Sequence, residues 1–106
     1  MKLRWTDSGV VLDDPQDFES FKVQVDRIDA PPEQLAAAFS GIAVFSDPHT
    51  AWVFEAALRQ WKGCEKDAAW QAGLDRMIAK ARPHGWIDDA RGAIRSHVEW
   101  LQRGEQ

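Results

Sequence analysis

The clearest pattern of apolar positions lies between Asp67 and Arg82. Six small or apolar residues recur there at the three- and four-residue spacing of one helix face: Trp70, Gly73, Leu74, Met77, Ile78 and Ala81. This spacing predicts an amphipathic helix over residues 67–82. Asp67 suits the N-cap, because its carboxylate can accept hydrogen bonds from free backbone N–H groups. Pro83 and Gly85 predict the end of the helix.

Gly73 is the unexpected member of this apolar stripe. Glycine lowers helix stability by roughly 1 kcal/mol relative to alanine. Its place on the apolar face suggests that a sheet or a second helix approaches the backbone closely there.

The pattern elsewhere favours short strands. Residues 1–14 predict a hairpin around Ser8-Gly9. Residues 18–28 alternate, with Phe21, Val23 and Val25 on one side, which predicts a half-buried antiparallel strand. A short helix is expected to open near Ala30, and residues 42–45 form an apolar run typical of a buried strand.

Two segments allow two structures each. Residues 47–62 could form one long helix, or a turn followed by a strand and a short helix; the β-formers Trp52 and Val53 favour the second structure. Residues 86–101 could form a strand, a turn and a second strand, or a helix. Their β-branched and aromatic content favours the strands.

These elements predict an α+β fold in one domain over residues 1–106. We expect an antiparallel sheet of about four to six strands. The main helix, 67–82, and one or two short helices are expected to cover one face of that sheet.

Composition and charge narrow the class of partner. The net charge is −4, and residues 1–53 hold nine acidic but four basic residues. An acidic balance of this kind argues against binding to nucleic acid or to an anionic membrane. The single cysteine, Cys64, fits a reducing compartment, and no run approaches the ~18 apolar residues of a membrane span. We therefore expect a cytoplasmic protein.

Candidate site chemistry is sparse. Asp47 and His49 lie at a predicted turn next to Trp52, and an imidazole is the usual general base near neutral pH. His97 and Glu99 would share one strand face and could line a ligand-binding cleft. No metal-ligand spacing or phosphate-binding loop is present in the sequence, so we expect neither a metal nor a cofactor.

The six tryptophans, with no tyrosine, are the most unusual feature of the composition. Tryptophan is enriched in interface hot spots, and a strand edge near Trp86 or Trp100 could pair with a second copy. The leading hypothesis is therefore a non-enzymatic interaction module that acts as a homo-oligomer or subunit. One alternative is a small-ligand-binding domain or minor enzyme with a polar pocket. Another is an acidic inhibitor of a basic partner, of the immunity or antitoxin kind.

Overall fold

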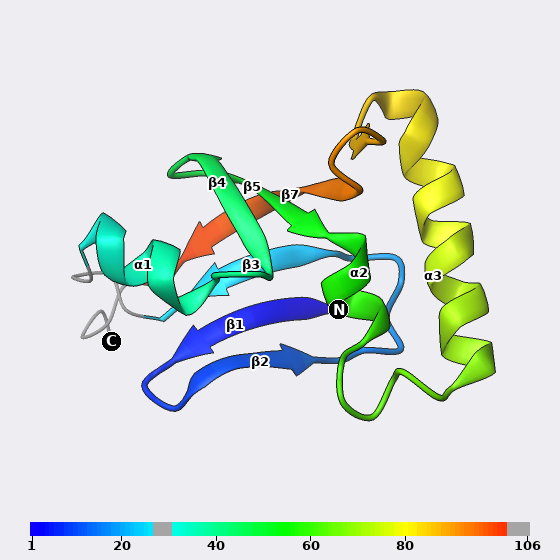
Figure 1. Ribbon diagram of the computed structural model, residues 1–106, viewed down its shortest axis with the longest axis horizontal. Coiled ribbons are helices and arrows are strands. Elements are labelled where there is room, and N and C mark those ends of the chain that lie inside the picture. Colours follow the sequence, from blue (N-terminus) through cyan, green and yellow to red (C-terminus); the bar gives the residue numbers. More distant parts are fainter. Residues whose placement is uncertain (27–30, 102–106) are drawn as a thin grey trace.

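The seven strands of the protein form one mixed sheet in a computed structural model that describes residues 1–26 and 31–101. Figure 1 shows the elements, whose bounds are β1 Lys2–Thr6, β2 Gly9–Asp13, β3 Lys22–Val25, α1 Pro32–Ala38, β4 Ala43–Asp47, β5 Thr50–Phe54, α2 Glu55–Arg59, α3 Ala68–Ala81, η1 Arg82–His84, β6 Ile87–Asp88 and β7 Ala93–Trp100. The strand order is β2-β1-β3-β7-β5-β4, and the short β6 pairs with β7. The α+β class is confirmed.

The direction of β3 corrects the sequence-based expectation. β3 runs parallel to both β1 and β7, whereas the other strand pairs are antiparallel. The predicted antiparallel sheet of about four to six strands is therefore confirmed only in part, because the sheet is mixed and has seven strands. Alternation of side chains has a period of two in either direction, so it identifies a strand and its faces but not the orientation of its neighbours.

Both ambiguous segments adopt the hairpin alternative. β4 and β5 pair around a turn, and α2 begins directly after β5. β6 pairs with β7 in the same antiparallel manner. The hairpin within residues 1–14 is also confirmed as the β1–β2 pair. The predicted strand over 18–28 is shorter, at Lys22–Val25, and residues 27, 28 and Ala30 lie outside the described part of the chain.

The main helix forms as the sequence predicts. The Asp67 side chain caps α3 by accepting a hydrogen bond from the backbone N–H of Trp70 at 3.0 Å. Five stripe residues are buried: Trp70, Gly73, Leu74, Met77 and Ile78. The chain continues into the 3₁₀ turn η1 and leaves it through Gly85, whose φ of 77° suits a residue without a side chain.

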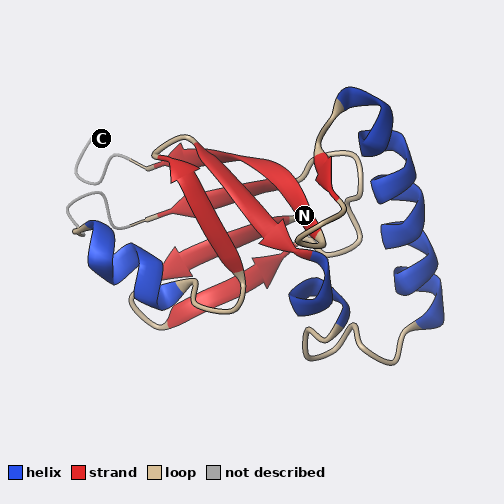
Figure 2. Ribbon diagram, turned by 45° about the horizontal axis from the view of Figure 1, so that its top comes forward, coloured by secondary structure: helices blue, strands red, loops and turns tan. Residues whose placement is uncertain are grey.

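One face of the sheet supplies the core. The strand register places Leu3, Val23 and Val98 side by side on this face, and each is at most 1 % exposed. The core also includes Leu35 of α1, Leu58 of α2 and the stripe of α3, so the helices pack against the same face. Figures 1 and 2 show α1 at one end of the sheet and α3 at the other. No helix among the described residues is long and apolar enough to cross a membrane.

Candidate functional site

Unequal strand lengths leave an opening in the middle of the sheet. On the side of β7 that faces away from β5, β3 pairs with His97–Trp100 and β6 pairs with Ala93 and Ile94. Arg95 and Ser96 therefore lie between the ends of two partner strands. These two polar residues therefore lie at a break in the sheet. On the other side of β7, both remain paired with β5.

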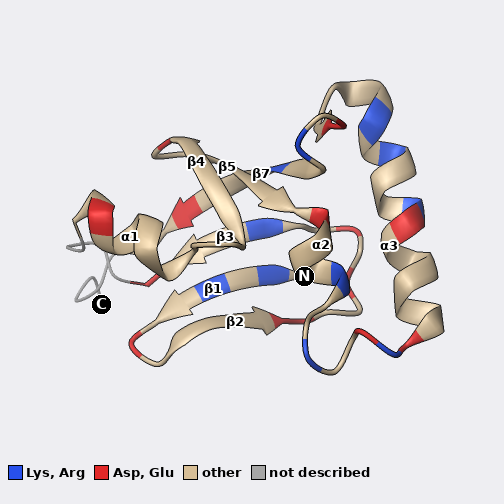
Figure 3. Ribbon diagram, viewed as in Figure 1, with Lys and Arg blue, Asp and Glu red and all other residues tan. Residues whose placement is uncertain are grey.

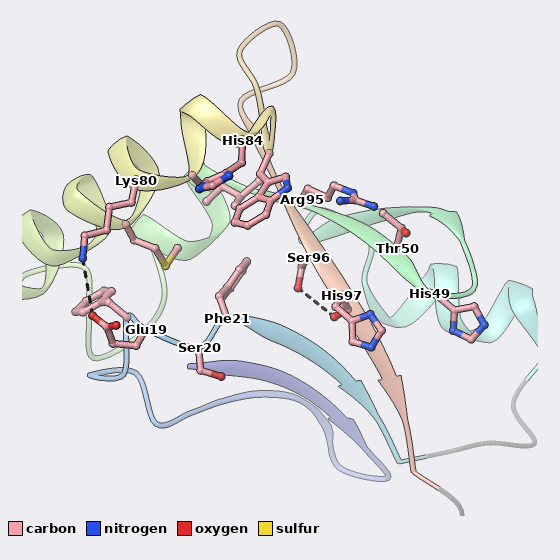
Figure 4. Close-up of a pocket in the computed structure, with 15 residues that line it drawn as sticks. Glu19, Ser20, Phe21, His49, Thr50, Lys80, His84, Arg95, Ser96 and His97 are labelled. Carbon is pink, nitrogen blue, oxygen red and sulfur yellow. Dashed lines mark hydrogen bonds and ion pairs between the residues drawn. The ribbon is translucent and has the colours of Figure 1, made fainter.

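A cleft of about 740 Å³ lies beside this opening. Its walls come from residues 18–21, His49 and Thr50 at the β4–β5 turn, the C-terminal half of α3, His84, Trp86 and residues 94–97 of β7. In Figure 4, Lys80 and Glu19 lie at one end, His49 and His97 lie at the other, and Arg95 lies between them. The cleft therefore joins segments that are far apart in the sequence.

Part of the lining is apolar: Phe18, Phe21, Met77, Ala81 and Ile94. The Phe18 ring packs against the Trp70 ring, with the two ring centroids 5.9 Å apart, and this contact holds Phe18 in place. Met77 and Ile94 are both buried members of the core. The cleft thus has an apolar surface that is continuous with the core of the fold.

Most ionisable side chains that line the cleft are basic, although the whole chain has a net charge of −4. All three histidines, His49, His84 and His97, line the cleft together with Lys80 and Arg95. The one carboxylate in the lining is Glu19, whose Oε2 lies 3.9 Å from Lys80 Nζ. Both side chains are mostly exposed, at 86 % and 79 %, so this ion pair contributes little.

An aromatic pair lies at the end of the opening nearest α3. The rings of His84 and Trp86 stack with centroids 4.4 Å apart and planes inclined by 21°. The left-handed Gly85 between them allows the chain to bring the two rings onto one side. The Arg95 N–H donates to the Trp86 carbonyl at 2.7 Å, which attaches this pair to β7.

The structure brings together two of the five predicted ligand-binding residues. His49 and His97 line the cleft, and Thr50 is the cross-strand neighbour of His97. Asp47 is outside the lining; its carboxylate accepts a hydrogen bond from the His49 backbone N–H at 2.7 Å, which is ordinary turn chemistry. Glu99 is also outside the lining, and its Oε1 lies 3.3 Å from Lys22 Nζ.

Trp52 is outside the lining as well. It is the cross-strand neighbour of Arg95, and the Arg91 guanidinium lies 5.7 Å from the centroid of its ring. That distance is within the range of a cation–π contact. Trp52 therefore stabilises the β6–β7 loop rather than contributing a surface to the cleft.

The two predicted interface tryptophans have different surroundings. Trp86 is 41 % exposed and lies in the cleft lining. Trp100 lies on β7, which has β3 on one side and β5 on the other, so it is not on an edge strand. Its indole N–H donates to the Pro48 carbonyl at 2.7 Å. A role of either residue in an interface stays a prediction.

The sequence reasoning did not assign Lys80, His84 or the apolar lining to the site. In the sequence, Lys80 is only a cation near a helix end, and His84 is only one of three histidines without metal-ligand spacing. Arg95 did carry a signal, because the alternation along the predicted strand places it on the same face as His97. The described residues contain no group of three or more His, Cys, Asp or Glu side chains that could hold a metal ion.

The comparisons with known proteins supply no role for the cleft. Comparison with known proteins found no matching family model and no significant similarity to a curated protein or to a solved structure. The function must therefore be inferred from the chemistry of the cleft itself.

Proposed function

We propose that this protein binds a small organic molecule in the cleft beside β7. The observation that carries the proposal is the combination of buried apolar lining residues, such as Met77 and Ile94, with polar side chains from separate segments around one concavity. Ligand sites typically enclose about 300–1,000 Å³ and combine apolar walls with a few polar groups. The cleft, at about 740 Å³, has that size and that lining.

The hydrogen-bond surroundings of the histidines favour ligand binding over catalysis. Within residues 1–26 and 31–101, no hydrogen bond joins an imidazole to a carboxylate or a hydroxyl group that would orient it as a general base. Asp47, the acid nearest to His49 in sequence, bonds to the backbone instead. The histidines are therefore proposed as hydrogen-bonding groups for a ligand.

A fragment screen by NMR tests this proposal directly. We expect several fragments to shift the backbone resonances of Phe21, Arg95 and His97, because Phe21 comes from one wall of the cleft and the other two residues come from β7. Trp86→Ala should weaken binding, whereas Val44→Ala should not. Val44 is a matched control, since it is 43 % exposed against 41 % for Trp86 and lies outside the lining. Shifts confined to other surfaces would refute the proposal.

Self-association is a second proposal, and it rests on one edge of the sheet. β4 is the terminal strand of the described sheet, and Val44 on it is exposed. A strand edge with an exposed apolar residue can pair with another chain. If two copies pair there, sedimentation at about 100 µM should show a dimer that Val44→Lys abolishes. A monomer at that concentration would contradict this proposal without affecting the cleft.

A further inference from the structure

Arg95 differs from most other arginines of the described chain. Four arginines hold carboxylates through their guanidinium groups: Arg4, Arg59, Arg82 and Arg91. Arg95 is exposed in the cleft, and no carboxylate among the described residues lies within ion-pair distance of it. Within residues 1–26 and 31–101, this guanidinium on a central strand therefore has no carboxylate partner, although the chain as a whole is acidic.

The nearby carboxylates are already occupied by other cations. Asp88 Oδ2 lies 2.7 Å from Arg91 Nε, and this hydrogen bond lowers the pKa of Asp88, so the acid stays ionised and paired. Asp89 Oδ2 lies 2.6 Å from Arg82 Nη1. Glu99, on the same strand as Arg95, is paired with Lys22. None of these three acids is therefore free to neutralise Arg95.

The register places further donors next to this guanidinium. His97 is two residues along β7 on the same face as Arg95, and Thr50 is directly opposite His97 on β5. All three residues line the cleft, and His49 precedes Thr50 at the same end. Figure 3 shows basic positions at the start of β7 and on the neighbouring β3. Guanidinium, imidazole and hydroxyl groups are the donors that proteins use for anionic oxygens.

Trp86 adds a flat apolar surface close to these donors. Its carbonyl accepts the hydrogen bond from the Arg95 N–H, and its ring stacks on that of His84. Phe21 supplies a second aromatic ring to the same cleft. A ligand with a planar part and a charged part next to each other would match this arrangement of Trp86 and Arg95.

We propose that the cleft selects a planar aromatic anion, with its carboxylate or phosphate oxygens held by Arg95 and His97 and its ring placed against Trp86. This inference rests on the proposed ligand-binding function and adds the sign of the charge and the orientation of the ligand. Electrostatic attraction from Arg95 provides the selectivity, because Lys80 lies 3.9 Å from Glu19, the one carboxylate of the described lining, whereas Arg95 has no carboxylate partner among the described residues.

Four probes of similar size test the sign of the charge. Benzoate, benzamide and benzamidine share one ring and carry negative, neutral and positive groups. Comparison of phenyl phosphate with benzoate shows whether the cleft prefers a phosphate or a carboxylate. Each is titrated into ¹⁵N-labelled protein while the Arg95 side-chain Nε–H and Trp86 indole N–H signals are followed. We expect benzoate or phenyl phosphate to bind at least 10-fold more tightly than benzamide, and benzamidine to bind most weakly.

Two charge-removing variants locate the anion. Arg95→Gln should weaken benzoate or phenyl phosphate about 10-fold to 100-fold, as expected for the loss of a charged hydrogen bond, while benzamide changes little. Arg76→Gln is the matched control, because Arg76 is an exposed arginine of α3 outside the cleft lining. It removes the same charge and should leave all four affinities within twofold. Urea denaturation of both variants shows whether the fold is kept.

The outcomes separate this inference from the function on which it rests. If benzamide or benzamidine binds in the cleft as tightly as benzoate, the cleft binds ligands but the inference about charge is overturned. An equal loss of affinity in Arg95→Gln and Arg76→Gln also overturns it, because the attraction would then be nonspecific. If neither these probes nor any fragment of the screen shifts the cleft resonances, both proposals fail.

Discussion

The Phe18 ring lies against the backbone of Gly73, at the place where a side chain on that helix residue would project. A Cβ built on Gly73 would lie 2.6 Å from Phe18 Cζ, much closer than carbon atoms approach in proteins. The close approach that the sequence suggested at Gly73 is therefore real, but it involves a ring from the loop before β3 rather than a sheet or a second helix. The same ring forms part of the cleft wall.

Gly73→Ala should therefore destabilise the protein, although alanine is the better helix former. The gain in helix propensity is roughly 1 kcal/mol, whereas overpacking a filled site costs about 1–3 kcal/mol. In the Phe18→Ala background the collision is absent, so Gly73→Ala should raise the free energy of unfolding. Urea denaturation of the wild type, the two single variants and the double variant measures the effect of Gly73→Ala on the free energy of unfolding with and without the Phe18 ring. Stabilisation by Gly73→Ala in the wild-type background would contradict the prediction.

Trp70→Phe should lower the free energy of unfolding by about 1–3 kcal/mol. The Trp70 side chain is 1 % exposed, and its indole N–H donates to the Pro15 carbonyl at 2.8 Å. Phenylalanine removes this donor and leaves a partly buried carbonyl without it. Trp86→Phe is the control, because that residue is exposed and should change stability by no more than about 0.5 kcal/mol. Equal effects of the two substitutions would show that the hydrogen bond to Pro15 is unimportant.

Gln71 joins α3 to the segment before it. Its side-chain amide donates to the carbonyls of Arg59 and Cys64, both at 3.1 Å, and its oxygen accepts from Arg59 Nη1 at 2.8 Å. Gln71→Glu keeps the acceptor for Arg59 but loses the donor, so we expect a loss of about 1–2 kcal/mol in urea denaturation. Gln34→Ala, at an exposed position of α1, should be nearly neutral. If both variants are neutral, the amide does not hold these segments together.

Cys64 should react slowly with alkylating reagents around pH 8. The thiol is buried, and burial raises its pKa above the ordinary value, with further contributions from the carboxylates of Asp67 and Glu65. Thiolate is the reacting species, so iodoacetamide should modify the folded protein more slowly than a free thiol. Asp67→Asn keeps a good N-cap residue while removing one charge, and it should speed the reaction. A wild-type rate equal to that of a free thiol would refute this prediction.

The raised pKa of Cys64 also makes the free energy of unfolding depend on pH. Because the folded state holds the Cys64 proton to higher pH than the unfolded state, the contribution of this thiol is fully present below the unfolded pKa and is lost as the pH rises through the folded pKa. Cys64→Ser removes the titration, so its free energy of unfolding should decline less than that of the wild type in alkaline solution. Parallel declines of the two proteins would contradict this expectation.

The sequence by itself determined the elements whose signals are local. The apolar spacing, the cap at Asp67 and the stop after Arg82 are read within a few residues of one another, and α3 follows them. The same holds for the turn before Thr50 and for the β-formers Trp52 and Val53, which identified the β4–β5 hairpin. Backbone hydrogen bonding and side-chain period act over short distances, so a short stretch of sequence contains this information.

Only the tertiary structure decided the direction of β3, the opening beside Arg95 and the composition of the cleft. Each depends on which strands become neighbours and where they end, and the period of a strand carries no information about either. The contact of Phe18 with Gly73 spans residues far apart in the chain. Lys80 and Arg95 likewise reach one cleft because α3 and β7 pack on the same core. Such long-range convergence is a property of packing, and a local pattern does not contain it.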